Sequence, residues 1–557
     1  MTPQRSPFAN LPISELQSPL PESDMECLDY CLRTKVRPGF YTDETLWTDR
    51  ATLGVLYAAM STDRLARREF RQYVLSYQKE EDLAALVHAS GIDVPPGTPK
   101  GQIGSILAAV PWQRDVPAAV HIAQFLQIPA DLLPLHAEKD ERGTVCGPAT
   151  RPFKPLKLYQ LDVADRASSE LDSPFSRVLI QMPTGSGKTR TAMEIISRFL
   201  NERTGPTRVL WLAHVRELCE QAQDAFVEVW EHMGEQEIAV NLIEGSGDMP
   251  ADLPPRVFVA GGLQKLYSQL KKTRTLPQFD LVVIDEAHKA VAPTYEQVIE
   301  RTVGWGGRLL GLTATPGRLL GGTRENARMA AFFNNKLVGL DAQLIGERDE
   351  DMGVMRALQR GRILARLIRE PIETGLNIRL TAADLKAIGA RGDYSEDLLR
   401  CIASDRKRNA VIISKLIEVA ERGLRTIYFG TSVEQSKIMT ALLVAKGIPA
   451  AHVDGTTPRA LRAAHAARFK DGKIKVLLNF DVFSTGFDAP KTDAVFIARP
   501  TQSVVLYSQM IGRGLRGPSI GGKETCVLID VVDNLETFSP DLDDIYGFFD
   551  EYWTGAS

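Results

Sequence analysis

The sequence has neither long hydrophobic runs nor a dominant charge. No stretch of its 557 residues approaches the roughly 18 apolar residues that a membrane helix needs. The first residues lead into no apolar segment of the kind found in secretory signals. The formal charge is only −4, from 66 Lys and Arg against 70 Asp and Glu, so any surface that binds nucleic acid must be local. We therefore expect a cytoplasmic protein with no membrane segment.

Cysteine is also scarce, and its six positions are scattered. Cys27 and Cys31 lie close together, but no second pair of Cys or His at zinc-binding spacing follows them. This pattern predicts buried or free thiols in place of a zinc site. The apolar fraction of 44% and the charged fraction of 24% are ordinary for a globular protein. The length favours roughly three to four domains.

The first 150 residues contain no long run typical of a β-strand. Residues 1–23 are rich in Pro, Ser and Gln, so we expect a poorly ordered arm. A helical domain is predicted over residues 24–150. Four arginines share three- and four-residue spacing, which predicts one helix face that is either solvated or in contact with phosphates; they are Arg64, Arg67, Arg68 and Arg71.

Residues 81–110 favour a helix, a short extended loop and a second helix that begins near Lys100. This order resembles the SAP-type helix–loop–helix module, which binds DNA. A plain helical hairpin fits the same residues equally well. The N-terminal domain is therefore expected to bind either DNA or a protein partner.

After a linker at 136–155 that is rich in Gly and Pro, short apolar runs alternate with helical stretches. The runs occupy 209–213, 257–260, 281–284 and 309–312, then 426–429, 475–478, 494–497 and 526–529. This alternation predicts two tandem α/β domains with parallel sheets, over 156–317 and 401–535. Residues 318–400 are expected to form a helical connector with little strand character. The tail at 536–557 holds acids and aromatics, and we expect it to pack back on the body.

The most informative stretch is Gln-Met-Pro-Thr-Gly-Ser-Gly-Lys-Thr at 181–189. An apolar run precedes it and a helical pattern follows it, the setting in which a glycine-rich turn binds phosphate with backbone N–H groups and the helix dipole. Lys188 would reach the β- and γ-phosphates of ATP, and the Thr189 hydroxyl would hold Mg²⁺. A turn that binds nothing is the alternative. The other residues expected around the phosphates are Thr184, Gly185, Ser186 and Gly187.

A second polar cluster, Asp285-Glu286-Ala287-His288, ends an apolar run. At the carboxyl end of a parallel strand it would lie at the same sheet edge as the phosphate loop. Asp285 is suited to hold Mg²⁺, Glu286 to orient or deprotonate the attacking water, and His288 completes the predicted catalytic group. An acidic pair at the start of a helix is the alternative interpretation.

With further motifs downstream, these residues resemble superfamily 2 helicases and translocases, in the DEAD/DEAH-like group that contains RadD-type proteins and type III restriction motor subunits. The resemblance covers 156 to about 535 and implies two RecA-like domains. It implies that Gln160 contacts the adenine base, and that Gly486 and Asp488 contribute to the nucleotide site. It also implies nucleic-acid contacts at Arg216, Gln264, Thr313, Thr315, Thr431 and Thr485.

The segment Gln509-Met-Ile-Gly-Arg513-Gly-Leu-Arg516 carries chemistry that the phosphate loop lacks. Phosphoryl transfer spreads negative charge over three oxygens, and an arginine from a second body can stabilise it. Arg513 and Arg516 are candidates for that role, with Gln509 in contact with the phosphate or water. Surface arginines on a glycine turn are the alternative.

The sequence thus predicts an ATP- and Mg²⁺-dependent DNA helicase or translocase that contacts the DNA backbone without reading sequence. Two alternatives stay open. One is an RNA helicase, and the other is an ATP-gated DNA-binding module that recruits or licenses a nuclease through residues 1–150. DNA repair and anti-phage defence would suit either DNA reading. Acidic residues at 541–544 are interpreted as solvated, because no nuclease lysine follows them.

Overall fold

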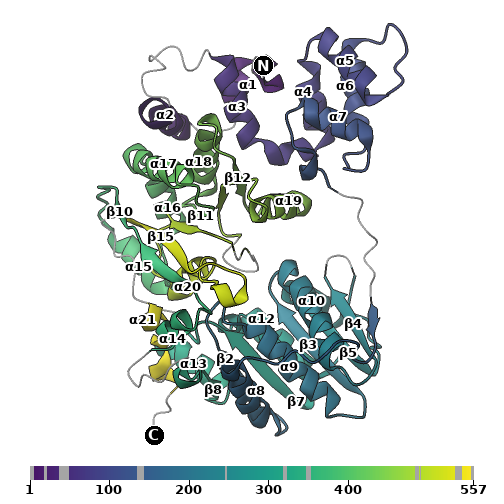
Figure 1. The fold of residues 1–557 in the computed structure, drawn as a ribbon, viewed down its shortest axis with the longest axis vertical. Coiled ribbons are helices and arrows are strands. Elements are labelled where there is room, and N and C mark those ends of the chain that lie inside the picture. The colour runs from purple at the N-terminus through teal and green to yellow at the C-terminus, as the bar shows by residue number, and fades with distance from the viewer. Residues whose placement is uncertain are drawn as a thin grey trace.

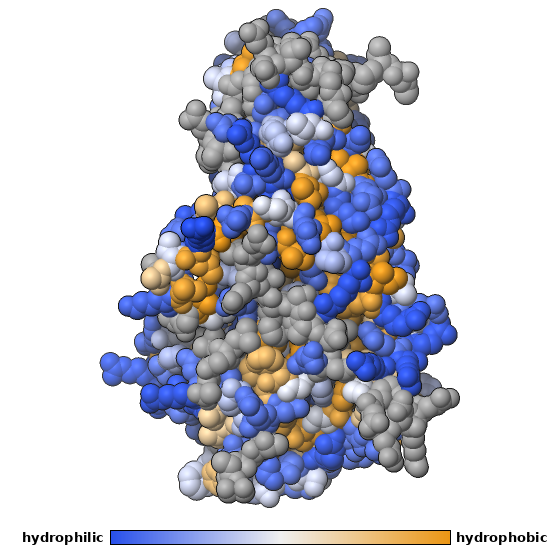
Figure 2. Space-filling view, turned by 90° about the vertical axis from the view of Figure 1, so that its left-hand side faces the viewer, coloured by the Kyte–Doolittle hydropathy of each residue, from blue (hydrophilic) through white to orange (hydrophobic). Residues whose placement is uncertain are grey.

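The computed structural model describes residues 6–17, 22–36, 49–134, 143–244, 247–317, 323–345, 353–482, 489, 491–533 and 542–553. Two sheet domains lie one above the other, and a helical N-terminal domain lies beyond the second of them (Figure 1). Within these ranges no helix has the length and apolar character to cross a membrane. On the face in Figure 2, hydrophilic residues dominate and hydrophobic ones lie between them.

The first domain is built on an eight-stranded sheet in the order β1-β4-β5-β3-β6-β7-β2-β8. The strands are β1 Thr144–Cys146, β2 Arg177–Gln181, β3 Thr207–Ala213, β4 Ile238–Ile243, β5 Arg256–Gly262, β6 Phe279–Asp285, β7 Val303–Thr313 and β8 Leu337–Val338. β1 runs antiparallel to β4, and the other strand pairs are parallel. Because β1 belongs to this sheet, the predicted boundary near residue 150 is several residues too late.

Helices cover both faces of the first sheet, which explains the continuous apolar runs of its central strands. The helices are α8 Leu158–Leu171, α9 Lys188–Asn201, α10 Arg216–Met233, α11 Leu263–Thr273 and α12 Pro293–Thr302. Alternate strand residues enter different clusters: Val178 and Ile180 pack with α8, α9 and α10, whereas Leu179 packs with α11 and α12.

The second domain contains a parallel sheet in the order β10-β15-β14-β11-β13-β12, with β9 also paired to β15. Its strands are β9 Arg366–Arg369, β10 Ile372–Glu373, β11 Thr426–Phe429, β12 Ala450–Val453, β13 Val476–Asn479, β14 Ala494–Ile497 and β15 Thr525–Val532. Its helices are α17 Arg406–Glu421, α18 Val433–Ala445, α19 Arg459–Lys470 and α20 Val504–Ile511. The predicted fold class, two tandem parallel-sheet domains after a helical region, is confirmed.

The connector departs from the prediction of little strand character. It carries helices α13 Thr323–Phe332, α14 Val354–Arg360, α15 Ala382–Arg391 and α16 Glu396–Ala403, but also three strands. β8 extends the first sheet, and β9 and β10 pair with β15 of the second. These strands have two to four residues and lie at sheet edges, so their sequence shows no long apolar run.

The N-terminal domain is helical, with η1 Pro7–Asn10, α1 Ile13–Gln17, α2 Glu22–Cys31, α3 Arg50–Met60, α4 Arg68–Ser76, α5 Glu80–Ser90, α6 Lys100–Ala109 and α7 Pro117–Phe125. The prediction of a disordered arm over 1–23 is wrong for residues 7–17, because Phe8, Leu11 and Leu16 are buried in the core of this domain. Residues 80–109 do form a helix, an extended loop and a second helix.

The four N-terminal arginines do not share one exposed helix face. Arg71 is buried, and its guanidinium donates to the carbonyls of Leu65, Ala66 and Ala108. Arg64 lies over the ring of Phe70, with 4.3 Å between its Cζ and the ring centre. Only Arg67 and Arg68 are exposed, so neither sequence interpretation holds for the whole set.

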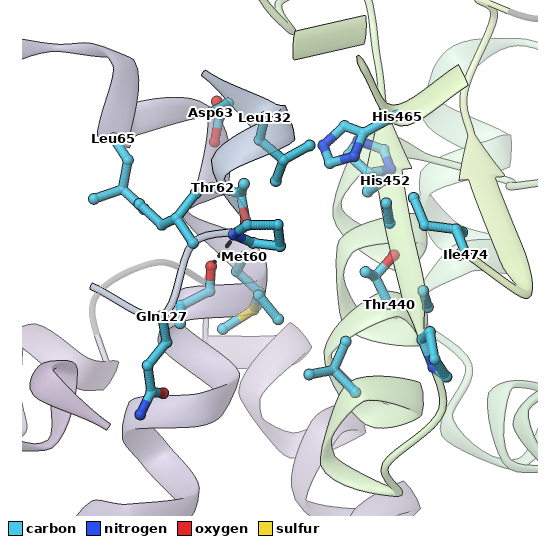
Figure 3. A pocket seen from close by; sticks show the side chains of 18 of the residues that line it. Met60, Thr62, Asp63, Leu65, Gln127, Leu132, Thr440, His452, His465 and Ile474 are labelled. Carbon is cyan, nitrogen blue, oxygen red and sulfur yellow. Dashed lines mark hydrogen bonds between the residues drawn. The ribbon is translucent and has the colours of Figure 1, made fainter. Parts of the chain in front are cut away.

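The N-terminal domain packs on the second sheet domain. Cys27, Cys31 and Leu56 are buried together with Ile413 of α17 and Met439 of α18. Between the two bodies lies a cavity of about 400 Å³, lined by residues such as Met60 and Leu132 on one side and His452 and His465 on the other (Figure 3). None of the site residues predicted from the sequence lines it.

A buried ion pair joins α17 to the end of β15, and it yields a stability prediction. Arg408 Nε donates to Asp533 Oδ2 at 2.9 Å, and both side chains are fully buried. Asp533→Ala should destabilise the protein by about 3–5 kcal/mol, because it leaves a buried charge without its partner. Thermal or denaturant unfolding would measure this loss.

The matched control is Glu524→Ala, which removes a carboxylate whose partner Arg362 is 63% exposed. That change should cost only about 0–1 kcal/mol. Equal losses for the two variants would contradict the role given to the buried pair.

Candidate active site between the two sheet domains

The loop between β2 and α9 owes its shape to two glycines and a serine. Gly185 and Gly187 have positive φ angles of 88° and 93°. A Cβ at Gly187 would lie 2.1 Å from Nε2 of Gln160 and would be strained at this φ angle, so glycine is favoured there. Ser186 Oγ donates to the Pro183 carbonyl at 2.8 Å, so this hydroxyl closes the loop on itself. The residues predicted to surround phosphates therefore form one compact turn at the N-terminus of α9.

The first turn of α8 supports that loop from below. Tyr159 Oη donates to the Ser186 carbonyl at 2.8 Å, and Gln160 Nε2 donates to the same oxygen at 3.2 Å. Gln160 Oε1 also accepts from the Lys157 N–H. Gln160 thus positions the loop, and its contact with adenine stays a prediction. Tyr159 was missed by the sequence reasoning, although an aromatic residue beside Gln160 could have signalled it.

Asp285 and Glu286 lie at the carboxyl end of β6, and Glu286 has an unusual backbone. Its φ of +54° is left-handed, a strained conformation for a residue with a side chain. The Glu286 N–H donates to Asp285 Oδ1 at 3.0 Å. This turn places two carboxylates at the sheet edge that carries the phosphate loop.

The two carboxylates differ in their electrostatics. Burial raises the pKa of Asp285, and the charge of Glu286 adds to that shift. Burial alone would also raise the pKa of Glu286, but the positive charges of Lys188 and Lys289 lower it. A carboxylate kept charged in this way accepts hydrogen bonds from water and is a weak base. The arrangement therefore favours orientation of water by Glu286 over proton removal.

His288 connects Glu286 to the end of β7. Burial lowers the pKa of His288 to about 3, so the ring is neutral near pH 7. Its Nδ1 lies 3.4 Å from Glu286 Oε2 and 3.5 Å from Thr313 Oγ1. Thr313 Oγ1 in turn donates to the Thr315 carbonyl. Thr313 and Thr315 are buried in these contacts, and their contact with nucleic acid stays a prediction.

The second domain contributes residues to the same site as Asp285 and the phosphate loop. A cavity of about 320 Å³ is lined by Thr189 and Asp285 of the first domain and by Arg516 and Lys470 of the second. Arg516 Cγ lies 3.7 Å from the position that a Cβ on Gly185 would take. The structure therefore brings Arg516 to the residues expected to hold phosphate and Mg²⁺. Lys470, at the end of α19, was not predicted.

The groups in this cavity fit a nucleoside triphosphate with a divalent cation. The Thr189 hydroxyl and the Asp285 carboxylate offer the oxygen ligands that Mg²⁺ prefers, alongside phosphate oxygens. The tight glycine turn leaves room for backbone N–H groups to approach an anion closely, and Lys188 supplies the adjacent positive charge.

Arg516 is held through its backbone. The connector forms an antiparallel bridge between Leu364 and Arg516, and the Ala365 N–H donates to the Leu515 carbonyl at 2.8 Å. A Cβ at Gly522 would lie 2.0 Å from the Arg516 carbonyl oxygen, so glycine is required there. These contacts fix where the guanidinium can reach.

Arg513 and Gln509 are placed differently. Gln509 is buried on α20, and Arg513 Nε donates to its carbonyl at 3.3 Å. Neither is among the described residues that line the cavity with Asp285. Of the two predicted arginines, the structure therefore favours Arg516 as the group that meets the phosphates.

The remaining nucleic-acid predictions have mixed outcomes. Arg216 is paired with Glu220 at 2.8 Å, and Gln264 is exposed at the start of α11. Thr431 is buried, accepts from Arg408 Nη1 and donates to the Ala498 carbonyl, and its contact with nucleic acid stays a prediction. Thr485, Gly486 and Asp488 lie outside the described residues.

Ion pairs between α10 and α19 close the cleft beside Arg216. Arg462 Nη1 lies 3.2 Å from Glu217 Oε1, and Arg459 pairs with Glu220. Each pair joins the first domain to the second. The sequence did not predict them, because these residues are about 240 positions apart.

Two sequence families match the chain, one on each sheet domain. The family described as "Type III restriction enzyme, res subunit" matches residues 153–318. The family described as "Helicase conserved C-terminal domain" matches residues 408–517. The first match contains the phosphate loop and Asp285, and the second ends just after Arg516.

Curated relatives align with about two thirds of the chain. "Putative ATP-dependent helicase IRC3" of Saccharomyces cerevisiae is 26% identical over 68% of this chain and 51% of its own length. "Type I restriction enzyme EcoKI endonuclease subunit" of Escherichia coli K12 is 22% identical over 69% of this chain and 35% of its own. "ATP-dependent rRNA helicase RRP3" of Meyerozyma guilliermondii is 23% identical over 61% of this chain and 62% of its own.

The chain thus spans about half the length of the yeast relative and about a third of the bacterial one. The two matched families cover the sheet domains that carry the phosphate loop, the carboxylates and Arg516. These matches support the assignment of the two sheet domains to superfamily 2 of the helicases and translocases.

Proposed function

We propose that the protein is an ATP-dependent DNA helicase or translocase. The observation that supports this most directly is the cavity that joins Thr189 and Asp285 of one domain to Arg516 of the other. An active site divided in this way is complete only when the domains are close together. Hydrolysis is then linked to relative movement of the domains, which is what a motor requires.

Bound ATP with Mg²⁺ would supply a γ-phosphoryl group whose transfer to water spreads negative charge over its oxygens. Thr189 and Asp285 would hold the cation, and Lys188 with the loop N–H groups would hold the phosphates. Glu286, kept charged by Lys188, would orient the water. Arg516 would stabilise the charge that develops, and it can do so only from the closed arrangement.

The contacts across the cleft are suited to reversible opening. The pairs Arg459–Glu220 and Arg462–Glu217 keep between a quarter and a half of each side chain exposed. Pairs with such exposure contribute about 0–1 kcal/mol each. Closing therefore depends on the nucleotide more than on these surface pairs. Nucleic acid that contacts both domains would be held differently in the open and closed arrangements.

DNA is the substrate we propose, and backbone contacts would make binding independent of sequence. RNA is the second candidate, because one relative is named as an rRNA helicase. A third candidate is an ATP-gated DNA-binding module whose N-terminal domain recruits a protein partner. The helix–loop–helix at residues 80–109 supports DNA contact by that domain. Cytoplasmic location and a role in repair or anti-phage defence belong to the same proposal.

One experiment separates these candidates: the ATPase rate with single-stranded DNA, duplex DNA and RNA in parallel, followed by strand displacement on the best stimulator. We expect DNA to stimulate hydrolysis more than RNA. Lys188→Ala should abolish the stimulated rate, because the charge that meets the phosphates is lost. Stronger stimulation by RNA would overturn the DNA proposal, and stimulation without displacement would favour a translocase or a clamp.

Glu286→Gln should retain ATP binding and lower hydrolysis by about 100-fold or more, because the amide no longer aligns water as a carboxylate does. Equilibrium binding of ATP and steady-state hydrolysis would be measured on the same preparation. Glu300→Gln, an exposed position on α12, serves as the control and should match the wild type. Loss of ATP binding in Glu286→Gln would contradict the water-orienting role.

Arg516→Ala should lower the rate of hydrolysis by about 10³-fold with little change in ATP affinity, because an arginine supplied from a second body acts mainly on the transition state. Arg513→Ala should lose less, since Arg513 does not line the cavity. Arg400→Ala, with a side chain that is 64% exposed, is the control. A larger loss for Arg513→Ala than for Arg516→Ala would reverse the assignment.

A further inference from the structure

The chain leaves the second domain after β15 and returns to the first. Residues 542–553 form α21 Leu542–Gly547 and η9 Asp550–Tyr552, and α21 lies beside α14 (Figure 1). Three apolar residues at four-residue spacing are buried there: Ile545, Phe549 and Trp553. We call residues 542–553 the C-terminal segment.

Tyr546 fixes this segment to the strand that leads into the phosphate loop. Gln181, the last residue of β2, donates through Nε2 to the Tyr546 carbonyl at 2.6 Å. The Tyr546 hydroxyl accepts from the Leu340 N–H at 3.1 Å. Because Met182 and the loop follow Gln181 directly, this anchor lies one residue before the predicted phosphate-binding turn.

Phe549 and Trp553 fix the same segment to Pro316 and Gly317, which follow the end of β7 at Thr313. Trp553 Nε1 donates to the Pro316 carbonyl at 2.7 Å. A Cβ at Gly317 would lie 2.0 Å from the Phe549 ring, so the ring takes the space that only glycine leaves. The C-terminal segment thus contacts the end of β2 and the residues that follow β7, beside the active site.

Ile545 lies where the two domains meet. It lines a residual space of about 20 Å³ together with Pro183 and Thr184 of the loop and with Ile511 and Leu515 of the second domain. A space of that size holds about one water molecule, so these groups are closely packed. Leu515 immediately precedes Arg516. Thr184 Cβ lies 2.8 Å from the position that a Cβ on Gly512 would take.

We propose that Ile545 and Tyr546 are positioning residues, which hold the phosphate loop and the Arg516 turn in the relative placement that hydrolysis needs. This proposal rests on the proposed ATPase function. Tyr546 supplies the anchor on the first domain, and Ile545 fills the junction with the second. The segment sets the distance between Arg516 and the loop without touching the reacting atoms.

A positioning role makes a prediction that differs from that of ordinary core packing. A truncation that only weakens the fold lowers the unfolding temperature but leaves the rate of the folded enzyme unchanged. Loss of Ile545 should instead let the Arg516 turn shift against the loop. Misplacement by about 1 Å can cost on the order of 100-fold in rate. ATP binding should persist, because the groups that hold its phosphates lie in the first domain.

The experiment compares Ile545→Ala, Ile545→Val and Ile402→Ala in the full chain, at a temperature well below unfolding. Ile402 is a fully buried isoleucine in a separate cluster on α16, so Ile402→Ala controls for loss of packing alone. We expect kcat to fall by about 10- to 100-fold in Ile545→Ala, with KM for ATP changing less than about twofold. Ile545→Val should restore most of the rate, and Ile402→Ala should lower Tm while its kcat stays at the wild-type value.

ATP affinity is measured separately in the double variant Ile545→Ala, Glu286→Gln, which should bind ATP as Glu286→Gln alone does. Suppose that Lys188→Ala abolishes hydrolysis but Ile545→Ala leaves kcat unchanged. This result would overturn the positioning role and leave the ATPase assignment intact. Equal loss of kcat in Ile402→Ala and Ile545→Ala would also overturn it, since both would then reflect packing. Loss of ATP binding in the double variant would do the same.

Discussion

The placement of Arg516 beside Gly185 and Asp285 is the constraint on which the rest of the site depends. Arg516 comes from the second sheet domain, whereas the other two come from the first. No single domain therefore contains a complete site. An arginine stabilises the charge that develops on a transferred phosphoryl group. This stabilisation falls quickly as the two separate, because water enters the cleft when it opens. Small changes in the distance between the two domains would therefore cause large changes in the rate of hydrolysis.

Several weak or short elements contribute to that relation. The connector pairs Leu364 with Arg516 and adds strands to both sheets. The pairs of α19 with α10 are partly exposed and contribute little each. The C-terminal segment adds Ile545 at the junction itself.

The sequence predicted the parts of the site whose signal is local. A glycine turn before a helix and carboxylates after an apolar run are each visible within ten residues. The two parallel sheets are visible in the alternation of short apolar runs with helical stretches. The errors have a common physical cause, which is that burial depends on distant neighbours. Arg71 looks accessible by type, yet its guanidinium is buried and donates to three backbone carbonyls. Strands of two to four residues such as β9 have no periodicity to detect. The contribution of Tyr159 depends on a carbonyl that lies 27 positions away.

In the part of the chain that the structure describes, the N-terminal domain packs on the second sheet domain, so its influence on this site would pass through that domain. Helix α19 is the shared element. Near its end Arg468 pairs with Asp131 of the N-terminal domain, and near its start Arg462 pairs with Glu217 across the cleft. A helix of this length moves as a rigid body, so displacement of one end displaces the other. DNA or a partner that binds the N-terminal domain would therefore change the rate of hydrolysis only if its affinity differs between two positions of α19. A ligand that binds both positions equally would leave ATP hydrolysis unchanged, however tightly it bound.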